Sequence, residues 1–300
     1  MTLSILIPVY NYPVKNLVNE LLQQCYAISI EFEILLLDDG SHEFLSENEA
    51  LALQFKEVCF LRNHQNKGRS ASRNTLLKQA KGMWIWFLDC DVRAHENTLL
   101  VQNYLAVCQP SKLISGGRKY DVQKPKDAEF YLHWLWGAKR ELLEPADRMK
   151  DPVNAFLSNN FWMWRETALS IQFNTELTGY GYEDTLFAAE CRNMGIEIEH
   201  IKNPVIHEGL DKKEVFLSKI EESLHNLLKI EALFRSQNID NPVKSKLTRA
   251  YSFLNTYLKW VVKPIAETSV PLIQKQLLSS KPSLFWFDMY RLAYLLSLEK

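Results

Sequence analysis

The fold is decided by residues 83–91, which read MWIWFLDCD: six apolar residues run directly into two aspartates that flank one cysteine. A run of this length, rich in aromatic side chains, is typical of a strand that is buried on both faces. Comparable runs occur at residues 3–9 (LSILIPV) and 32–37 (FEILLL), and the second of these also ends in acids, Asp38 and Asp39. The chain therefore begins with buried strands whose ends carry polar groups.

Segments with helical spacing separate these strands. Apolar residues recur every three or four positions up to Tyr26, in a helix that Asn11 can cap. Two more helices are expected over residues 46–56 and 70–80, with a short strand at 58–61 between them. This alternation predicts an α/β fold with a doubly wound, mostly parallel sheet.

Polar residues follow three of the expected strands: Asp38 with Asp39, residues 68–73, and Asp89 with Asp91. Open α/β sheets bind ligands at the carboxyl ends of their strands, so these clusters should converge in space. Residues two apart at an extended strand end point the same way, so Asp89 and Asp91 can share one Mg²⁺ or Mn²⁺ ion. The alternative is a solvated loop that merely contains two acids.

Composition narrows the class of protein. The 300 residues are 47% hydrophobic and 24% charged with a net charge of −1, which is ordinary for a globular protein and argues against nucleic acid as a partner. The five cysteines form no CxxC pair, which indicates reduced thiols in the cytoplasm. No signal peptide is expected, and no stretch of about 18 apolar residues predicts a membrane span.

Two aromatic segments, residues 130–136 and 161–164, stand out in the second half of the chain. Such aromatics either fill a core or stack on the flat faces of sugars. Gly117 is expected to let a donor sugar approach the backbone closely. The better candidates for acceptor contacts are Trp134, Trp136, Trp162 and Asn160.

Four motifs together resemble glycosyltransferase family 2, whose members have the GT-A fold; the resemblance covers the first 210 residues. The motifs are IPVYN at 7–11, DDGS at 38–41, NKGRSASRN at 66–74 and LDCD at 88–91, with Ser72 where the family usually has alanine. The resemblance implies that Asp39 binds the base, that Arg73 lies near the diphosphate, and that Asp89 and Asp91 serve ribose and metal. The donor-binding residues that it implies are Pro8, Tyr10, Asp39, Lys67, Arg73 and Asp89.

The segment GYGYED at 179–184 resembles the Gly-x-Gly-x-Glu-Asp acceptor motif of galactosyltransferase-like and chondroitin-polymerase-like enzymes. This implies Asp184 as catalytic base, with Glu183 as acceptor ligand or alternative base and Gly181 in the acceptor site. An acceptor hydroxyl needs such a carboxylate to take its proton during attack. The alternative is an acidic first turn that stabilises a helix dipole. His207 is the expected third metal ligand beside Asp89 and Asp91, as in related enzymes.

The last part of the chain, residues 211–300, is expected to be a helical extension to a catalytic domain at 1–210, with prolines such as Pro264 and Pro271 separating its helices. Residues 242–300 contain nine Lys or Arg against three Asp or Glu, interleaved with aromatics such as Trp260. This pattern suits either peripheral contact with anionic lipid at the inner face of the cell membrane, or a helical cap or homodimer contact.

The function expected from these features is metal-dependent, inverting transfer of a sugar from a nucleotide diphosphate donor, a UDP-sugar in many members of the family. The acceptor would be a hydroxyl of a saccharide or lipid-linked saccharide in cell-envelope polysaccharide biosynthesis, with Mn²⁺ or Mg²⁺ as cofactor. One alternative is a sugar-phosphate nucleotidyltransferase, although the loop at 8–13 lacks the glycine-rich, basic character that such enzymes carry after the first strand. The other is a non-catalytic carbohydrate-binding protein on the same fold.

Overall fold

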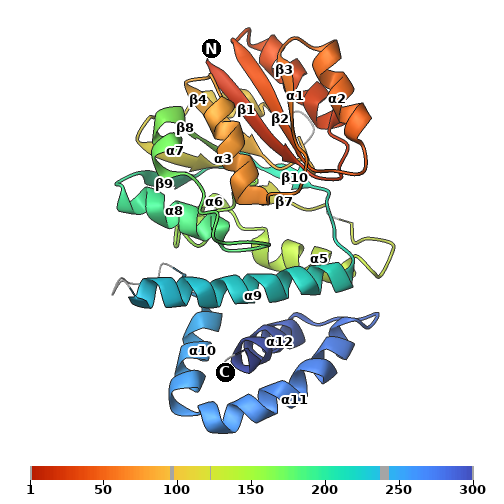
Figure 1. Ribbon diagram of the computed structural model, residues 1–300, viewed down its shortest axis with the longest axis vertical. Coiled ribbons are helices and arrows are strands. Elements are labelled where there is room, and N and C mark those ends of the chain that lie inside the picture. Colours follow the sequence, from red (N-terminus) through yellow and green to blue (C-terminus); the bar gives the residue numbers. More distant parts are fainter. Residues whose placement is uncertain (1, 95–97, 122, 237–242, 299–300) are drawn as a thin grey trace. The chain divides into compact units, whose positions relative to one another are not determined.

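The central sheet is built around β1 (Leu3–Val9), which pairs in parallel with β2 (Phe32–Asp39) on one side and with β4 (Trp84–Leu88) on the other. Helices cover both faces of this sheet (Figure 1). Among the residues that the computed structural model describes, namely 2–94, 98–121, 123–236 and 243–298, seven strands form it in the order β3-β2-β1-β4-β8-β6-β9. The remaining strands are β3 (Val58–Asn63), β6 (Lys112–Ser115), β8 (Asn160–Trp164) and β9 (Glu197–His200).

Alternation along β1 explains why both faces are covered. Ile5 and Ile7 belong to one apolar cluster, whereas Leu6 between them belongs to the other. Successive side chains of a strand point to opposite faces, so an uninterrupted apolar run needs helices on both sides. The predicted doubly wound α/β fold is confirmed.

The expected helix at residues 11–26 begins later than predicted. Asn11 does not cap it: its backbone φ is +48°, and its side-chain oxygen accepts from the N–H groups of His42 and Glu43. Asn11 therefore joins the loops after β1 and β2. The helices around the sheets are α1 (Lys15–Ala27), α2 (Leu45–Gln54), α3 (Arg69–Gln79), α4 (Leu100–Leu105), α6 (Pro145–Arg148), α7 (Arg165–Ile171) and α8 (Glu183–Asn193).

The aromatic segment at 161–164 forms most of β8, a strand that the sequence analysis did not predict. β8 runs antiparallel between β4 and β6, with Trp162 opposite both Trp86 and Ile114. Its central side chains are buried on both faces, so the segment lacks the polar alternation that marks a half-exposed strand. The sheet is consequently mixed rather than wholly parallel.

A smaller sheet brings distant segments together beside the end of β4. Its order is β5-β10-β7, and His207 in β10 pairs with Val92 in β5, immediately after the Asp89–Asp91 turn. Glu208 donates its N–H to the carbonyl oxygen of Asp91. The strands are β5 (Val92–Arg93), β7 (Arg118–Lys119) and β10 (Val205–His207).

The chain divides into two compact units. The first contains both sheets and consists of residues 1–121, 142–176 and 183–209; the second consists of 122–141, 177–182 and 210–300. The sequence predicts a boundary near residue 210, but two segments that precede this boundary group with the helical unit. As a division of function, the two-domain organisation stays a prediction.

The second unit is helical throughout its described elements. Pro264 and Pro271 lie inside one long helix instead of separating helices, contrary to expectation. None of the helices in the described part of the chain combines the length and apolar character that crossing a membrane requires. The elements are α5 (Tyr131–Trp136), the π-helix η1 (Gly137–Glu141), α9 (Lys213–Ser236), α10 (Lys246–Tyr257), α11 (Lys259–Leu277) and α12 (Leu284–Ser297).

One polar side chain, that of Asn160, holds the core of the first unit together. It is fully buried, and its oxygen accepts from the indole N–H of Trp86 at 3.0 Å and from the hydroxyl of Tyr104 at 2.7 Å. Its amide nitrogen donates to the carbonyl oxygens of Gly117 and Asn203. A buried amide with every partner in place is stabilising. Loss of that amide leaves the indole N–H of Trp86 and the carbonyl oxygen of Asn203 without this partner, whereas the Tyr104 hydroxyl and the Gly117 carbonyl each keep one hydrogen bond to the backbone.

We therefore expect Asn160→Ala to lower the free energy of unfolding by about 3 kcal/mol, because two buried donors and two buried carbonyls each lose a hydrogen bond. Urea unfolding measures this. The control is Asn154→Ala, which removes hydrogen bonds to the exposed Asp151 and should change stability by less than about 0.5 kcal/mol. Equal losses in the two variants would contradict the role given to the buried network.

Candidate active site

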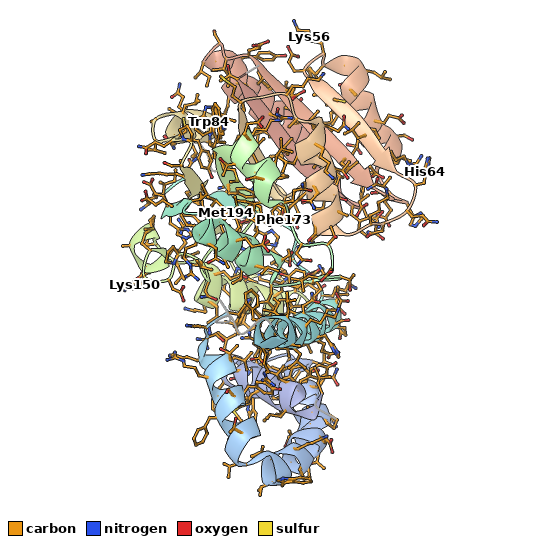
Figure 2. All side chains as sticks on the ribbon, turned by 60° about the vertical axis from the view of Figure 1, so that its left-hand side comes forward. Lys56, His64, Trp84, Lys150, Phe173 and Met194 are labelled. Atoms are coloured by element: carbon orange, nitrogen blue, oxygen red, sulfur yellow. The ribbon has the colours of Figure 1, made fainter. Side chains whose placement is uncertain are left out.

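A buried arginine connects the segments that the sequence predicts to converge. Arg73 lies on α3 and is only 1% exposed. It donates through Nη2 to Oδ1 of Asp89 at 2.9 Å, and its Nη1 lies 3.9 Å from Oε1 of Glu183. Its guanidinium also lies 5.2 Å from the ring centre of Phe173, which is labelled in Figure 2. The turn after β4, the helix α3 and the start of α8 therefore meet at one cation.

This burial changes the interpretation of Arg73. Arginine stays charged even when buried, so its carboxylate partners are part of what makes its position tolerable. Nε and Nη1 are buried without hydrogen-bond partners among the described residues. The expectation from the family resemblance that Arg73 lies near the diphosphate stays a prediction. The geometry of Arg73 suits positioning of Asp89 and Glu183.

The two acids of the Asp-x-Asp motif have different partners. They lie in a turn between β4 and β5 rather than at an extended strand end, so their side chains need not point the same way. Asp89 bonds to Arg73, whereas Oδ1 of Asp91 lies 3.5 Å from Nδ1 of His207. The expectation that Asp89 and Asp91 share one metal ion stays a prediction.

The surroundings of Asp91 keep its carboxylate ionised. Burial alone raises its pKa, but the interaction with His207 outweighs this effect, and the pKa is held well below its usual range. Arg69 and Arg118 lower the pKa of Asp91 further. Gly209 leaves room for the carboxylate, because a Cβ at that position would lie 2.1 Å from Oδ2 of Asp91. An ionised carboxylate is the form that binds a cation.

A carboxylate and an imidazole are donors that Mn²⁺ accepts, and Mg²⁺ accepts the carboxylate. Two ligand atoms about 3 to 3.5 Å apart can share one ion at bond lengths of about 2.1 Å, so the 3.5 Å between Asp91 and His207 fits. No group of three or more His, Cys, Asp or Glu side chains in the described residues is arranged to hold a metal. Asp89, the third expected ligand, is held on Arg73. The fit therefore rests on the Asp91–His207 pair.

The acidic pair opens α8, as predicted, and its two members have different environments. Glu183 is 6% exposed, and burial, followed by the charge of Asp184, raises its pKa above the ordinary value, while Arg69 and Arg73 oppose the rise. Asp184 accepts from the N–H of Ser158 at 3.1 Å through Oδ2. Its Oδ1 is buried and has no hydrogen-bond partner among the described residues. One oxygen of Asp184 is thus fixed while the other keeps its accepting capacity.

Asp39 fixes the turn that leads into α3. One oxygen accepts from the amide of Asn63 and the N–H of Lys67, and the other accepts from the N–H of Gly68 at 2.9 Å. The carboxylate of Asp39 therefore stabilises this turn through hydrogen bonds within the protein. Contact of Asp39 with a base stays a prediction. Of the other expected donor-binding residues, Pro8 lies within β1, Tyr10 is 48% exposed directly after β1, and Lys67 is exposed.

Three predicted ligand-binding residues are instead part of the protein interior. Trp162 is fully buried and stacks on Tyr104 at 5.3 Å, so it offers no face to a sugar. Asn160 has its hydrogen-bonding groups occupied by protein partners. The space beside Gly117 is filled by Arg148, whose guanidinium carbon would lie 2.7 Å from a Cβ there. Burial explains each of these errors.

The remaining predicted acceptor residues belong to the second unit. Gly181, with φ of +99°, packs so closely on α9 that a Cβ would lie 2.5 Å from the Cβ of Ser223. The Asn226 side chain donates to the carbonyl oxygen of Gly181 as well. Trp136 packs on Phe287 of α12, and Trp134 stacks on Tyr131 and keeps partial exposure. Their contacts with an acceptor stay predictions.

Three residues near Asp91 were missed at the level of the sequence: Arg69, Arg118 and Gly209. Arg69 lies within the basic segment at the start of α3, so its position was a usable signal. Arg118 and Gly209 carry no local signal, because only the small sheet brings them to Asp91.

Comparison with known proteins places this geometry in context. The glycosyl transferase family 2 profile matches residues 4–172. Curated relatives include an uncharacterised glycosyltransferase of Rickettsia conorii, which is 33% identical over 33% of this chain and 16% of the relative. A second relative, the uncharacterised glycosyltransferase YfnE of Bacillus subtilis, is 27% identical over 65% of this chain and 62% of its own length. A third relative is the UDP-Glc:alpha-D-GlcNAc-diphosphoundecaprenol beta-1,3-glucosyltransferase WfgD of Escherichia coli, which is 34% identical over 29% of this chain and 34% of its own length. The chain spans less than two thirds of the length of each of these relatives.

Solved structures share the fold at low identity. S. aureus TarS in complex with UDP aligns over 99% of this chain and 90% of its own, with 18% identity and a TM-score of 0.51. The mannosyltransferase PcManGT from Pyrobaculum calidifontis, in complex with GDP-Man and Mn²⁺, aligns over 98% of this chain and 85% of its own, with 15% identity and a TM-score of 0.61. The predicted GT-A fold with a helical C-terminal region is confirmed.

The raised pKa of Glu183 predicts a stability effect. The native state binds this proton more tightly than the unfolded chain, so the stability that Glu183 contributes is full below its unfolded value of about 4.5 and is lost as pH rises through the folded pKa. Glutamine cannot ionise, so Glu183→Gln removes the decrease in stability that ionisation of the buried Glu183 causes at higher pH. We expect the variant to be more stable than the parent at neutral pH, with the difference vanishing below pH 4.5. Urea unfolding across pH measures it, and a difference independent of pH would contradict the prediction.

Proposed function

This chain belongs to glycosyl transferase family 2, and we propose that it catalyses metal-dependent transfer of a sugar from a nucleotide diphosphate donor to an acceptor hydroxyl, with inversion at the anomeric carbon. Family membership makes the chain a glycosyltransferase enzyme. The observation that carries the finer proposal is the meeting of Asp89, Glu183 and Arg73, with Asp91 and His207 nearby in the same unit. In this proposal Asp91 and His207 would hold the metal, and Asp184, which follows Glu183 in the chain, would take the proton of the acceptor hydroxyl.

The reaction assigns a separate task to each acid. The acceptor oxygen forms a bond to the anomeric carbon while the bond from that carbon to the diphosphate oxygen breaks. The proton of the acceptor hydroxyl passes to Oδ1 of Asp184, which the N–H of Ser158 orients through Oδ2. Asp91 and His207 would hold the divalent cation. When bound, this cation neutralises charge on the leaving diphosphate.

Glu183 and Arg73 prepare the site in this scheme. Glu183 lies beside Asp184 and close to the guanidinium of Arg73. Arg73 holds Glu183 and Asp89 near one another without reaching the solvent. Fixed charges of this kind cost little reorganisation when charge develops during the reaction.

The donor that we propose is a UDP-sugar. TarS binds UDP and UDP-GlcNAc, and WfgD is named for UDP-Glc, whereas PcManGT binds GDP-Man. The proposed acceptor is a saccharide or lipid-linked saccharide of the cell envelope, because WfgD acts on a diphosphoundecaprenol-linked sugar according to its name. We further propose action in the cytoplasm at the inner face of the cell membrane. A homodimer stays a prediction.

A panel of nucleotide sugars incubated with the protein and Mn²⁺ tests the donor class. We expect slow, metal-dependent hydrolysis of one UDP-sugar, because water can replace the acceptor in a prepared site. Released UDP is the measured product, and chelation of the metal is the control. Release of pyrophosphate from a sugar phosphate and a nucleoside triphosphate would point to nucleotidyl transfer instead.

Two isosteric variants separate metal binding from proton removal. Asp184→Asn should lower kcat by about 10² to 10⁴ and leave metal-dependent UDP binding intact, because only the base is lost. Asp91→Asn should abolish transfer and also weaken metal-dependent UDP binding, since it removes a metal ligand. Calorimetry and steady-state kinetics measure both effects. Full activity in Asp91→Asn would refute the metal assignment, and unchanged kcat in Asp184→Asn would refute the base.

A further inference from the structure

The helix α11 presents an apolar face to solvent. Trp260 is 94% exposed and Leu272 is 72% exposed. Val261 and Ile265 are 61% and 60% exposed. At 100° per residue these positions fall on one side of the helix, together with Pro264 and Pro271, which are also exposed.

The opposite side of the same helix already packs within the second unit. Ala266, Ile273 and Leu277 are buried there, and α12 lies alongside (Figure 1). The exposed apolar face is therefore a second hydrophobic surface, additional to the one that holds the unit together. A contiguous apolar face of this kind marks an interaction site.

The accessible charge of this region is mostly positive. Residues 242–300 carry nine Lys or Arg against three Asp or Glu. Lys275 lies on the exposed side of α11 itself, whereas the exposed acid on that side is Glu267. The other exposed basic residues among the described part of 243–298 are Lys244, Lys246, Arg249 and Lys281.

We propose that the exposed face of α11, with Trp260, Ile265 and Leu272 as its apolar anchors, binds the surface of a membrane that contains anionic lipid. Aromatic and aliphatic side chains on one side with basic residues around them are the pattern of helices that lie in the lipid interface. The indole of tryptophan is suited to this depth, since its ring is apolar and its N–H stays near water. The basic residues add attraction to anionic headgroups.

Charge favours a lipid surface over a second copy of this chain. Two copies that met through α11 would bring together two segments, residues 242–300 of each copy, in which Lys and Arg outnumber Asp and Glu by nine to three, and like charges across an interface are unfavourable. An anionic bilayer both covers the apolar face and neutralises the cations. The inference rests on the proposed function only in supplying a reason for the contact, since a lipid-linked acceptor lies in such a bilayer.

Co-sedimentation with vesicles tests the proposal. The full chain should bind vesicles of phosphatidylcholine with phosphatidylglycerol, bind pure phosphatidylcholine more weakly, and lose affinity as salt rises. Trp260→Ala and Leu272→Ala should each lower binding to the anionic vesicles by about tenfold. Leu53→Ala is the matched control, because Leu53 is an 88% exposed helical leucine on α2 and its loss should leave binding unchanged.

Three other results would overturn the proposal. Absence of binding by the parent protein, or equal binding by the parent, Trp260→Ala and Leu272→Ala, would refute it. A dimer that Leu272→Ala dissociates, without vesicle binding, would show that a second copy covers the face. Hydrolysis of the nucleotide sugar is measured separately on the same samples. Vesicle binding without any donor hydrolysis would support membrane binding by α11 and would contradict the proposed function.

Discussion

The first unit depends on one buried cation. Arg73 is almost wholly shielded from water, and its charge is compensated by the hydrogen bond to Asp89, with Glu183 lying 3.9 Å from its Nη1. These two acids come from the turn after β4 and from the start of α8, segments that are far apart in sequence. The need to pair this charge therefore fixes the positions of the same acids that the proposed chemistry uses. Structural and functional requirements coincide at Arg73.

Much of the fold could be predicted from local patterns, because β1, β2 and β4 are long apolar runs that end in polar residues. β8 could not, since its buried aromatic residues resemble core or binding residues equally well until the neighbouring strands are known. The contact of Arg73 with Asp89, and that of Asp39 with the turn before the same helix, followed from the general geometry of parallel sheets. The pairing of Asp91 with His207 did not, because it depends on the small sheet that β5, β7 and β10 form.

The errors among the site residues share a physical cause. Asn160, Trp162 and Gly117 have the chemistry of ligand-binding residues, but each is enclosed by the protein's own side chains. Residue type alone does not distinguish an amide that meets a sugar from one that meets a tyrosine hydroxyl and an indole. Burial distinguishes them, and burial is a property of the whole fold.

The glycine turn before Glu183 belongs to a different unit from the acids that it introduces. Gly179 and Gly181 pack on α9, and Asn226 of that helix donates to the carbonyl oxygens of Thr178, Tyr180 and Gly181. Every described strand of both sheets precedes residue 210, whereas α9, the helix on which this turn packs, follows it. The helical part consequently cannot be exchanged freely for that of a relative. The replacement would need a helix that packs against this turn and donates hydrogen bonds to its carbonyl oxygens, as α9 does.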